Sequence, residues 1–220
     1  GDVKGKSILH LQCHFGQDSI SLSRMGAKVT GVDFSDVAIT KAKELSSSMQ
    51  VDTKFICADI FDLPDQLFEQ FDIVFSSYGT IGWFPDINKW AMLVTHYLKP
   101  GGRFIFAEFH PVVWMYDNDF TDITYSYFNG EPIEENLTGT YAAKEDAIAT
   151  NTITWNHGLA EVIQALLSQG LQLCQCNEYN YSPYDCLSGM EEFEKRKYRI
   201  AKWANKIPLV YALAAEKKTL

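Results

Sequence analysis

Apolar runs alternate with amphipathic segments along the first half of the chain, and the same kinds of element return near its end. Strands that alternate with helices imply right-handed crossovers and a mostly parallel sheet. Short apolar runs predict seven buried strands, at Ser7–Leu11, Lys28–Val32, Thr53–Ala58, Phe71–Ser76, Arg103–Ala107, Leu171–Cys176 and Pro208–Ala215. Apolar positions at helical spacing predict helices, at Gln17–Met25, after an N-cap at Ser35, at Trp90–Leu98 and at Leu159–Leu167. The pattern therefore predicts an α/β fold with a doubly wound, mostly parallel sheet of seven strands.

The segment over residues 110–156 interrupts this alternation, because it is polar and aromatic and contains no long helical pattern. Thr121–Phe128 and Thr150–Trp155 alternate like the strands of an antiparallel pair, and Asn129-Gly130 is a turn signal between shorter runs. So long a stretch inside a compact domain is usually a lid or a binding insertion. We therefore expect a single domain over residues 1–220, with a substrate-side antiparallel lid.

The acidic net charge of the chain argues against nucleic acids and anionic membranes as partners. The chain carries a formal net charge of −9, whereas nucleic-acid backbones and anionic membranes reward clustered Lys and Arg. The most basic run, Lys195-Arg196-Lys197, lies beside three glutamates. We therefore expect it on a mixed, solvated face of a helix over Met190–Asn205. Neither a nucleic acid nor a membrane is expected as a partner.

The cysteines and the first residues bear on the compartment. Five scattered cysteines without paired spacing match neither a disulfide framework nor a zinc knuckle. The segment Gly1–Lys6 has no signal-peptide character, and we expect a reducing, cytoplasmic compartment. His10, Cys13 and His14 are near one another in the sequence, but strand and turn residues point in different directions and no fourth ligand is obvious. No metal site is therefore expected.

Chemistry-bearing residues gather where the first three strands end. In a doubly wound sheet, ligands bind beyond the carboxyl ends of the strands, where the strand order reverses. The first strand is followed by the turn Gln12–Gln17, in which only Gly16 is a glycine, and the second ends in Asp33. A carboxylate there suits a ribose diol, although it could also serve only the dipole of the following helix. Asp59-Ile60 after the third strand suits an adenine ring, because the acid accepts from the exocyclic amine while the apolar side chain covers a face.

Five strings together resemble class I S-adenosylmethionine-dependent methyltransferases. They are ILHLQCHFG at 8–16, VD at 32–33, ADI at 58–60, FDIV at 71–74 and LKPGG at 98–102. The match spans Ser7–Ala107 and, more loosely, the closing strands to Ala215. In that family the first turn wraps the methionine and ribose portion, and the acid after the second strand binds the ribose hydroxyls. The acid after the third strand addresses the adenine, and the backbone after the fourth lies near the methionine end.

The resemblance thus implies S-adenosylmethionine as the cofactor, bound by His14, Gly16, Gln17, Asp33, Phe34, Asp59, Ile60 and Ser76. The LKPGG string has a structural role, since it ends a helix and turns the chain back into the sheet. Family members often carry N-terminal helices that close over the cofactor, which leaves open such a cap before residue 1.

The first turn departs from the family pattern. His10 stands at the usual acid position, and Gln12 and His14 stand at two usual glycine positions. Residues with a Cβ keep the backbone farther from a ligand. Either the cofactor is slightly displaced, with side-chain contacts from His14 or Gln17, or it binds weakly. The string LHLQCHFG is identified as a variant that recurs among bacterial proteins resembling this group, which favours the first alternative.

The methyl acceptor is expected on the same rim. His110 could deprotonate an acceptor, since imidazole titrates near neutrality, or it could only hydrogen-bond the lid. Tyr78 could orient an acceptor or pack beneath the lid, and His157 is more readily a capping or core residue. The aromatic side chains of the insertion form a wall for a small acceptor, the core of a hairpin layer or the interface of a homodimer. They are Trp114, Tyr116, Phe120, Tyr125, Tyr127, Phe128, Tyr141 and Trp155.

Methyl transfer to a small-molecule acceptor is the function that the resemblance implies. The enzyme then mainly holds donor and acceptor together and excludes water, and a general base is needed only for a protonated nucleophile. Two alternatives stay open. An NAD-dependent oxidoreductase would also use Asp33, but it predicts a fuller glycine fingerprint. A non-catalytic module that binds an adenosyl ligand would keep the fold after its glycine turn degenerated.

Overall fold

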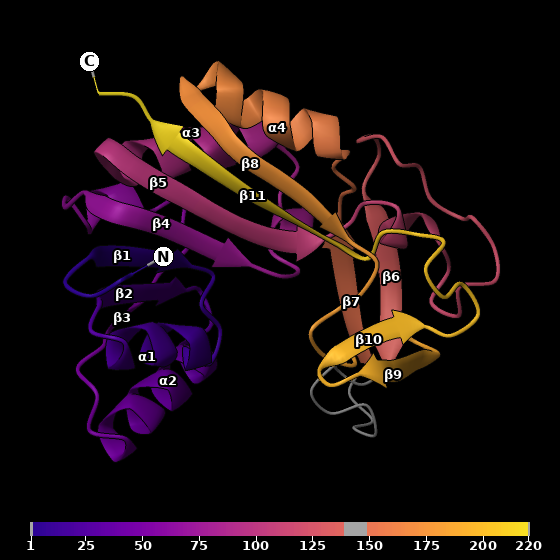
Figure 1. The fold of residues 1–220 in the computed structure, drawn as a ribbon, viewed down its shortest axis with the longest axis horizontal. Coiled ribbons are helices and arrows are strands. Elements are labelled where there is room, and N and C mark those ends of the chain that lie inside the picture. Colours follow the sequence, from indigo (N-terminus) through magenta and orange to yellow (C-terminus); the bar gives the residue numbers. More distant parts are fainter. Residues whose placement is uncertain (1, 139–148, 220) are drawn as a thin grey trace.

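A computed structural model describes residues 2–138 and 149–219, and a single seven-stranded sheet organises them (Figure 1). The strand order is β3-β2-β1-β4-β5-β11-β8. The first five of these strands run parallel, and β11 is antiparallel to both of its neighbours. Every predicted strand has its counterpart, so the doubly wound, mostly parallel sheet is confirmed. The strands are β1 (Ser7–Leu11), β2 (Lys28–Asp33), β3 (Lys54–Cys57), β4 (Phe71–Ser77), β5 (Leu98–Phe109), β8 (Leu171–Tyr179) and β11 (Val210–Lys217).

Helices pack on both faces of the sheet, as the alternation of strands and helices requires. The side chains of β1 show the division, because neighbouring strand residues point to opposite faces. Ile8 packs in a cluster with Leu22 of α1, whereas Leu9 belongs to the large core that holds residues of α3 and α4. The helices are α1 (Gln17–Arg24), α2 (Asp36–Ser48), α3 (Ile87–Tyr97) and α4 (Leu159–Ser168), with short 3-10 turns η1 (Leu63–Asp65), η2 (Ile81–Trp83) and η3 (Val113–Met115). Ser35 caps α2 as predicted, its hydroxyl accepting from the Ala38 N–H at 3.2 Å.

The FDIV and LKPGG strings meet at the amino end of the sheet. Asp72, at the start of β4, accepts hydrogen bonds from the Ser7 N–H and hydroxyl, and the Lys99 ammonium lies 2.9 Å from it. These donors lower the pKa of Asp72 to about 2. Gly101 adopts a left-handed φ of 74° within the first residues of β5, which follow directly on α3. Both strings therefore join strands, at the edge opposite to the predicted site.

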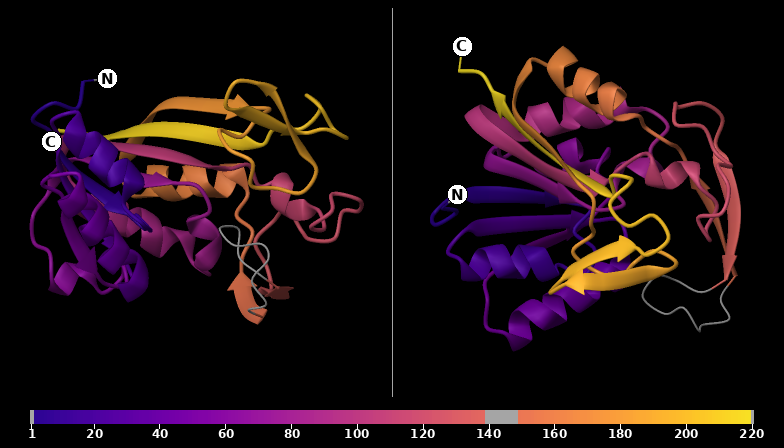
Figure 2. Two further views of the ribbon diagram at one scale, coloured as in Figure 1. Left: turned by 90° about the horizontal axis from the view of Figure 1, so that it is seen from below. Right: turned by 45° about the vertical axis from the view of Figure 1, so that its right-hand side comes forward.

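Two small hairpins stand beyond the carboxyl ends of the strands, where the β4 and β5 arrows point (Figure 1). β6 (Ile133–Thr138) pairs with β7 (Ala149–Thr154), and β9 (Met190–Glu194) pairs with β10 (Lys197–Ile200). Figure 2 shows them on opposite sides of the sheet. The antiparallel insertion is therefore present, and the carboxyl edge of the sheet lies between it and the second hairpin.

The prediction that Thr121–Phe128 is a strand of the insertion was wrong. Among the described residues, its strand pairing is limited to an isolated bridge between Tyr116 and Ile123. The Asp117 carboxylate accepts from the Thr121 N–H at 2.6 Å and from the Asp122 N–H at 3.3 Å. Such local bonds compete with strand pairing, and Ile133–Thr138 pairs with β7 instead.

The predicted helix over Met190–Asn205 was also wrong, because β9 and β10 form a hairpin there. Arg196 takes a left-handed φ of 59° in the turn, and its N–H donates to Glu192 at 2.7 Å. Across the strands, Arg199 lies 2.9 Å from Glu191 and its guanidinium stacks over the Phe193 ring. These cross-strand contacts override helix propensity. The basic run at 195–197 therefore lies on an exposed hairpin rather than on a helix.

None of the helices in the described ranges is long and apolar enough to cross a bilayer.

Candidate functional site

The first turn keeps a glycine-like backbone without the glycines. Gln12, His14 and Gly16 all have left-handed φ angles, of 54°, 49° and 68°. For residues with a Cβ this conformation costs about 1–2 kcal/mol each. The Gln12 and His14 positions, where glycine was expected, thus retain the conformation that glycine would adopt. The turn after β1 therefore has a left-handed backbone at three positions although only one of them is a glycine.

We expect this conformation to reverse the usual order of alanine and glycine. His14→Gly should be more stable than His14→Ala by about 1 kcal/mol, since glycine tolerates a positive φ. Urea unfolding of the two variants measures the difference. His96 is exposed on α3, and its Ala variant should be more stable than its Gly variant by about 1 kcal/mol. The same order at both positions would contradict the left-handed turn.

Asp33 joins the first turn to the loop that leads into α2. It is 6% exposed, and its two carboxylate oxygens accept from the His14 N–H at 2.8 Å and from the Ser35 N–H at 3.0 Å. Each carboxylate oxygen has a second lone pair. Asp33 therefore braces two turns and still has acceptor capacity for hydroxyl groups.

Exposed side chains flank Asp33 along the rim. Phe34 is 78% exposed, so most of its ring surface faces solvent, which is unusual for a phenylalanine. Asp59 is exposed and accepts from the Phe61 N–H at 2.9 Å. Ile60, by contrast, is buried in the main core, and Phe61 is the exposed apolar neighbour of Asp59. Phe34 and Phe61 are thus the apolar groups that this rim presents.

Glu108, near the end of β5, holds the loop that follows β4, and the sequence did not single it out. Its buried carboxylate accepts from the N–H groups of Thr80 at 2.7 Å, Phe109 at 2.7 Å and Ile81 at 3.4 Å, and also from the Gly79 N–H. The Thr80 hydroxyl adds a fifth bond at 3.1 Å. Burial raises the pKa of Glu108, while these backbone bonds oppose the shift. A carboxylate inside the apolar run RFIFAEF was the signal that could have revealed it.

The loop after β4 is tied in turn to the first turn, across the point where strand order reverses. The Gln12 side-chain amide donates to the Thr80 carbonyl at 2.9 Å. Ser76 is fully buried and its hydroxyl bonds that of Thr80 at 3.2 Å. Gln12, Thr80 and Glu108 therefore form one polar network that joins the ends of β1, β4 and β5.

His10, at the family's acid position, is a neutral buried residue. Its Nδ1 lies 2.8 Å from the Ser19 hydroxyl on α1, and its ring packs beside Phe75. Burial lowers the pKa of His10 to about 3. The described residues contain no group of three or more His, Cys, Asp or Glu side chains that could hold a metal ion.

Both ring nitrogens of His110 have a close polar neighbour, and one of the two contacts is a hydrogen bond. Nδ1 accepts from the Val112 N–H at 3.2 Å, and Nε2 lies 2.8 Å from the Glu178 carboxylate on β8. Burial lowers the pKa of His110, and Glu178 opposes this shift. His157 is likewise engaged, with Nε2 2.8 Å from the Phe84 carbonyl and Nδ1 3.3 Å from Glu161. His157 is therefore a core residue that ties α4 to the loop after β4.

Four aromatic rings from separate parts of the chain meet at the carboxyl edge, and we call them the aromatic wall: Tyr78, Phe109, Trp114 and Tyr184. The Tyr78 ring lies 5.6 Å from Phe109 and 5.7 Å from Tyr184, and Phe109 lies 5.5 Å from Trp114. Trp114 and Tyr184 are 38% and 39% exposed. Burial raises the pKa of Tyr78 to about 12, so its phenol is protonated at neutral pH. Tyr184 follows β8 and was missed, because the segment around it was not recognised as part of this edge.

The other aromatic residues of the insertion have different surroundings. Tyr116 packs against Phe120 and Trp203, in a small core that also includes Phe109 and the partly buried Tyr78. Tyr127 accepts from the Leu159 N–H at 3.1 Å, and Phe128 is 75% exposed. Tyr141 lies outside the described residues. The insertion thus packs against residues of β5, β10 and β11, and Trp114 is its contribution to the wall.

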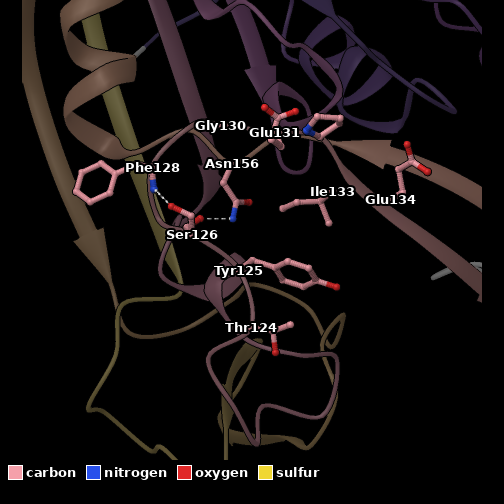
Figure 3. Close-up of a pocket in the computed structure, with 10 residues that line it drawn as sticks. Thr124, Tyr125, Ser126, Phe128, Gly130, Glu131, Ile133, Glu134 and Asn156 are labelled. Carbon is pink, nitrogen blue, oxygen red and sulfur yellow. Dashed lines mark hydrogen bonds between the residues drawn. The ribbon is translucent and has the colours of Figure 1, made fainter.

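A cavity of about 340 Å³ lies within the insertion, between residues 124–134 and Asn156 (Figure 3). The Asn156 amide donates to the Ser126 and Trp114 carbonyls at 2.7 Å and 3.1 Å, which holds the segment in place. None of the predicted donor-site residues lines this cavity. It is therefore a feature of the insertion and not the predicted cofactor site.

Comparisons with known proteins find similarity to methyltransferases. A family model described as a methyltransferase domain matches residues 2–165. A ubiquinone biosynthesis O-methyltransferase of Coxiella burnetii is 32% identical over 105 residues, which are 48% of this chain and 44% of that protein. Phosphoethanolamine N-methyltransferase 1 of Triticum aestivum is 30% identical over 108 residues, which are 47% of this chain and 21% of that protein. The match thus spans less than half the length of these curated relatives.

Solved structures share the fold along the whole chain. A protein of Listeria monocytogenes assigned to the S-adenosylmethionine-dependent methyltransferases has a TM-score of 0.71 at 21% identity, covering 100% of this chain and 93% of that one. One of Methanosarcina mazei has a TM-score of 0.65 at 18% identity, covering 99% of this chain and 94% of that one. At such low identity the likeness concerns the fold.

Proposed function

Because this chain belongs to the methyltransferase domain family and has the fold of S-adenosylmethionine-dependent methyltransferases, we propose that it transfers a methyl group from S-adenosylmethionine to a small-molecule acceptor. The observation that carries the proposal is the first turn. Its backbone is left-handed at three alternate positions, and Asp33 braces it against the loop before α2. This backbone conformation, in a turn that lacks the usual glycines, supports binding of the donor there.

The residues present fit the donor. On this proposal, Asp33 accepts the ribose hydroxyls, Asp59 accepts from the adenine amine, and the exposed Phe34 covers a face of the ring. His14, Gly16 and Gln17 hold the methionine portion from the first turn, and Ser76 shapes the loop opposite. Ile60 would support this rim from the core beneath it. When bound, S-adenosylmethionine supplies an activated methyl group on its sulfonium.

The aromatic wall is proposed to receive the acceptor. Trp114 and Tyr184 leave more than a third of their surfaces open at the carboxyl edge, and such rings suit a small, partly apolar molecule. The two curated relatives are named for small molecules, ubiquinone in one case and phosphoethanolamine in the other. Tyr78 would orient the acceptor through its protonated phenol. His110 would act as a base only after exchanging one of its two present partners.

On this proposal, these residues act mainly by positioning the donor and the acceptor. Two turns and a lid that hold donor and acceptor together and exclude water supply most of what this transfer needs. The five free cysteines accord with the reducing, cytoplasmic compartment that forms part of the proposal.

Calorimetric titration of the wild-type chain with S-adenosylmethionine, S-adenosylhomocysteine and NAD tests the proposal. We expect micromolar binding of both adenosyl ligands and none of NAD. Binding of NAD alone would favour the oxidoreductase, and binding without methyl transfer to any acceptor would favour a non-catalytic module. If neither adenosyl ligand bound, the proposed function would be wrong.

A further inference from the structure

The buried carboxylate of Glu108 has a hydrogen-bond environment composed almost entirely of donors. Its side chain is 2% exposed, and four backbone N–H groups donate to it. A protonated acid would have to place its own hydrogen against an acceptor. The single oxygen in this set that could accept is the Thr80 hydroxyl, whose own hydrogen is donated to Glu108 while Ser76 donates to its oxygen. The donors therefore fit the ionised form.

This negative charge has no cationic partner among the described residues. None of the ion pairs in that part of the chain includes Glu108. His110, two residues further on, is occupied by Glu178. A buried charge is costly unless it is paired or fully hydrogen-bonded. Here the backbone N–H groups supply the hydrogen bonds, and because they carry no formal charge, the side chain of Glu108 keeps its charge of −1.

The charge lies under the loop that is expected to face the methionine end of the donor. Glu108 bonds the N–H groups of Gly79 and Thr80, and Tyr78 and Gly79 turn the chain there with left-handed φ angles of 50° and 73°. Thr80 also receives the Gln12 amide, so the first turn is fixed to the same point. A fixed negative charge at this place, away from water, acts over several ångströms with little screening.

We propose that Glu108 makes the donor site prefer a sulfonium over a neutral thioether, and so favours S-adenosylmethionine over S-adenosylhomocysteine. This inference rests on the proposed function. In the transfer, the methyl carbon forms its new bond to the acceptor, and the electron pair of the broken bond stays on sulfur. The sulfur becomes neutral, so the attraction of Glu108 ends with the reaction and product release is favoured. Glu108 thus acts on the donor's charge without contacting the acceptor.

Calorimetry with both ligands on wild type and Glu108→Gln tests this inference. Glutamine keeps the shape and removes the charge. We expect affinity for S-adenosylmethionine to fall about tenfold more than affinity for S-adenosylhomocysteine. Glu216→Gln is the matched control, because it removes a charge from the carboxyl end of β11, where Glu216 pairs with Arg103 of the antiparallel neighbour β5. There the ratio of the two affinities should stay as in wild type.

A purely structural role for Glu108 gives a different result. Loosening of the loop would lower the affinities for both ligands equally. An unchanged ratio of the two affinities in Glu108→Gln would therefore overturn the inference. If that variant does not fold, wild type is compared for S-adenosylmethionine and its uncharged isostere, in which a carbon replaces the sulfonium sulfur. A preference of about tenfold for the charged ligand is expected, and equal affinity would refute it. Should wild type bind neither adenosyl ligand, the proposed function fails first, which is a distinct outcome.

Discussion

Asp33→Asn should weaken binding of S-adenosylmethionine about a hundredfold, because hydrogen bonds to a charged acceptor contribute about 1.5–3 kcal/mol. The variant should also lose about 1–2 kcal/mol of folding stability. Both carboxylate oxygens of Asp33 accept backbone N–H groups, of His14 and Ser35, and an asparagine NH₂ group would face one of these donors. Isothermal titration measures the first effect, and urea unfolding measures the second.

A ligand that lacks one ribose hydroxyl distinguishes the role of Asp33 in binding from its role in bracing the two turns. Wild type should bind S-adenosylhomocysteine more tightly than its 2′-deoxy form, whereas Asp33→Asn should bind both with similar affinity. Asp36→Asn provides the control, since Asp36 is an exposed acid at the start of α2 and carries the same charge. That variant should behave as wild type. If Asp33→Asn still discriminated fully between the two ligands, the ribose assignment would be wrong.

The fold could be predicted wherever local pattern and tertiary packing agree. The strands of the sheet and α1 to α4 have apolar positions on the faces that they bury, so periodicity alone located them. The hairpin β9–β10 could not be found in this way, because its pairs are between charged and aromatic residues that local propensity assigns to a helix. The prediction of a strand over Thr121–Phe128 failed for a different reason. The Asp117 side chain bonds the backbone of the turn at Thr121, which the alternating pattern does not reveal.

The candidate site was less accessible from sequence, for a different reason. Asp33 and Asp59 follow strand ends and can be located by counting. The left-handed φ angles of Gln12 and His14 could not be predicted, because these residue types rarely adopt that conformation. Glu108 acts through donors that lie 28 residues away in the chain, and only the pairing of β4 with β5 brings them together. Long-range polar networks of this kind have no periodic signal.

Gly16→Ala should be the most destabilising single change in the turn, at about 3 kcal/mol. Gly16 has a left-handed φ of 68°, which costs an alanine about 1 kcal/mol. A Cβ at this position would also lie 2.5 Å from two ring carbons of Phe55 and 2.9 Å from the Ala42 Cβ. Phe55 and Ala42 are both buried, so overpacking adds about 1–3 kcal/mol. Urea unfolding measures the loss, and affinity for S-adenosylmethionine should fall with it, because Gly16 begins α1 at the donor site.

Two further variants divide this loss between backbone strain and overpacking. Gly5→Ala has a similar φ of 75° with no heavy atom within 4 Å of the added Cβ, so it should cost only about 1 kcal/mol. Phe55→Leu removes part of the ring that the new methyl group would meet. In the Gly16→Ala background its cost should therefore be smaller than in wild type, by about 1 kcal/mol or more. Strictly additive losses in this double-mutant cycle would mean that the turn shifts away from Phe55, and that left-handed strain alone makes Gly16 the one glycine this divergent turn has kept.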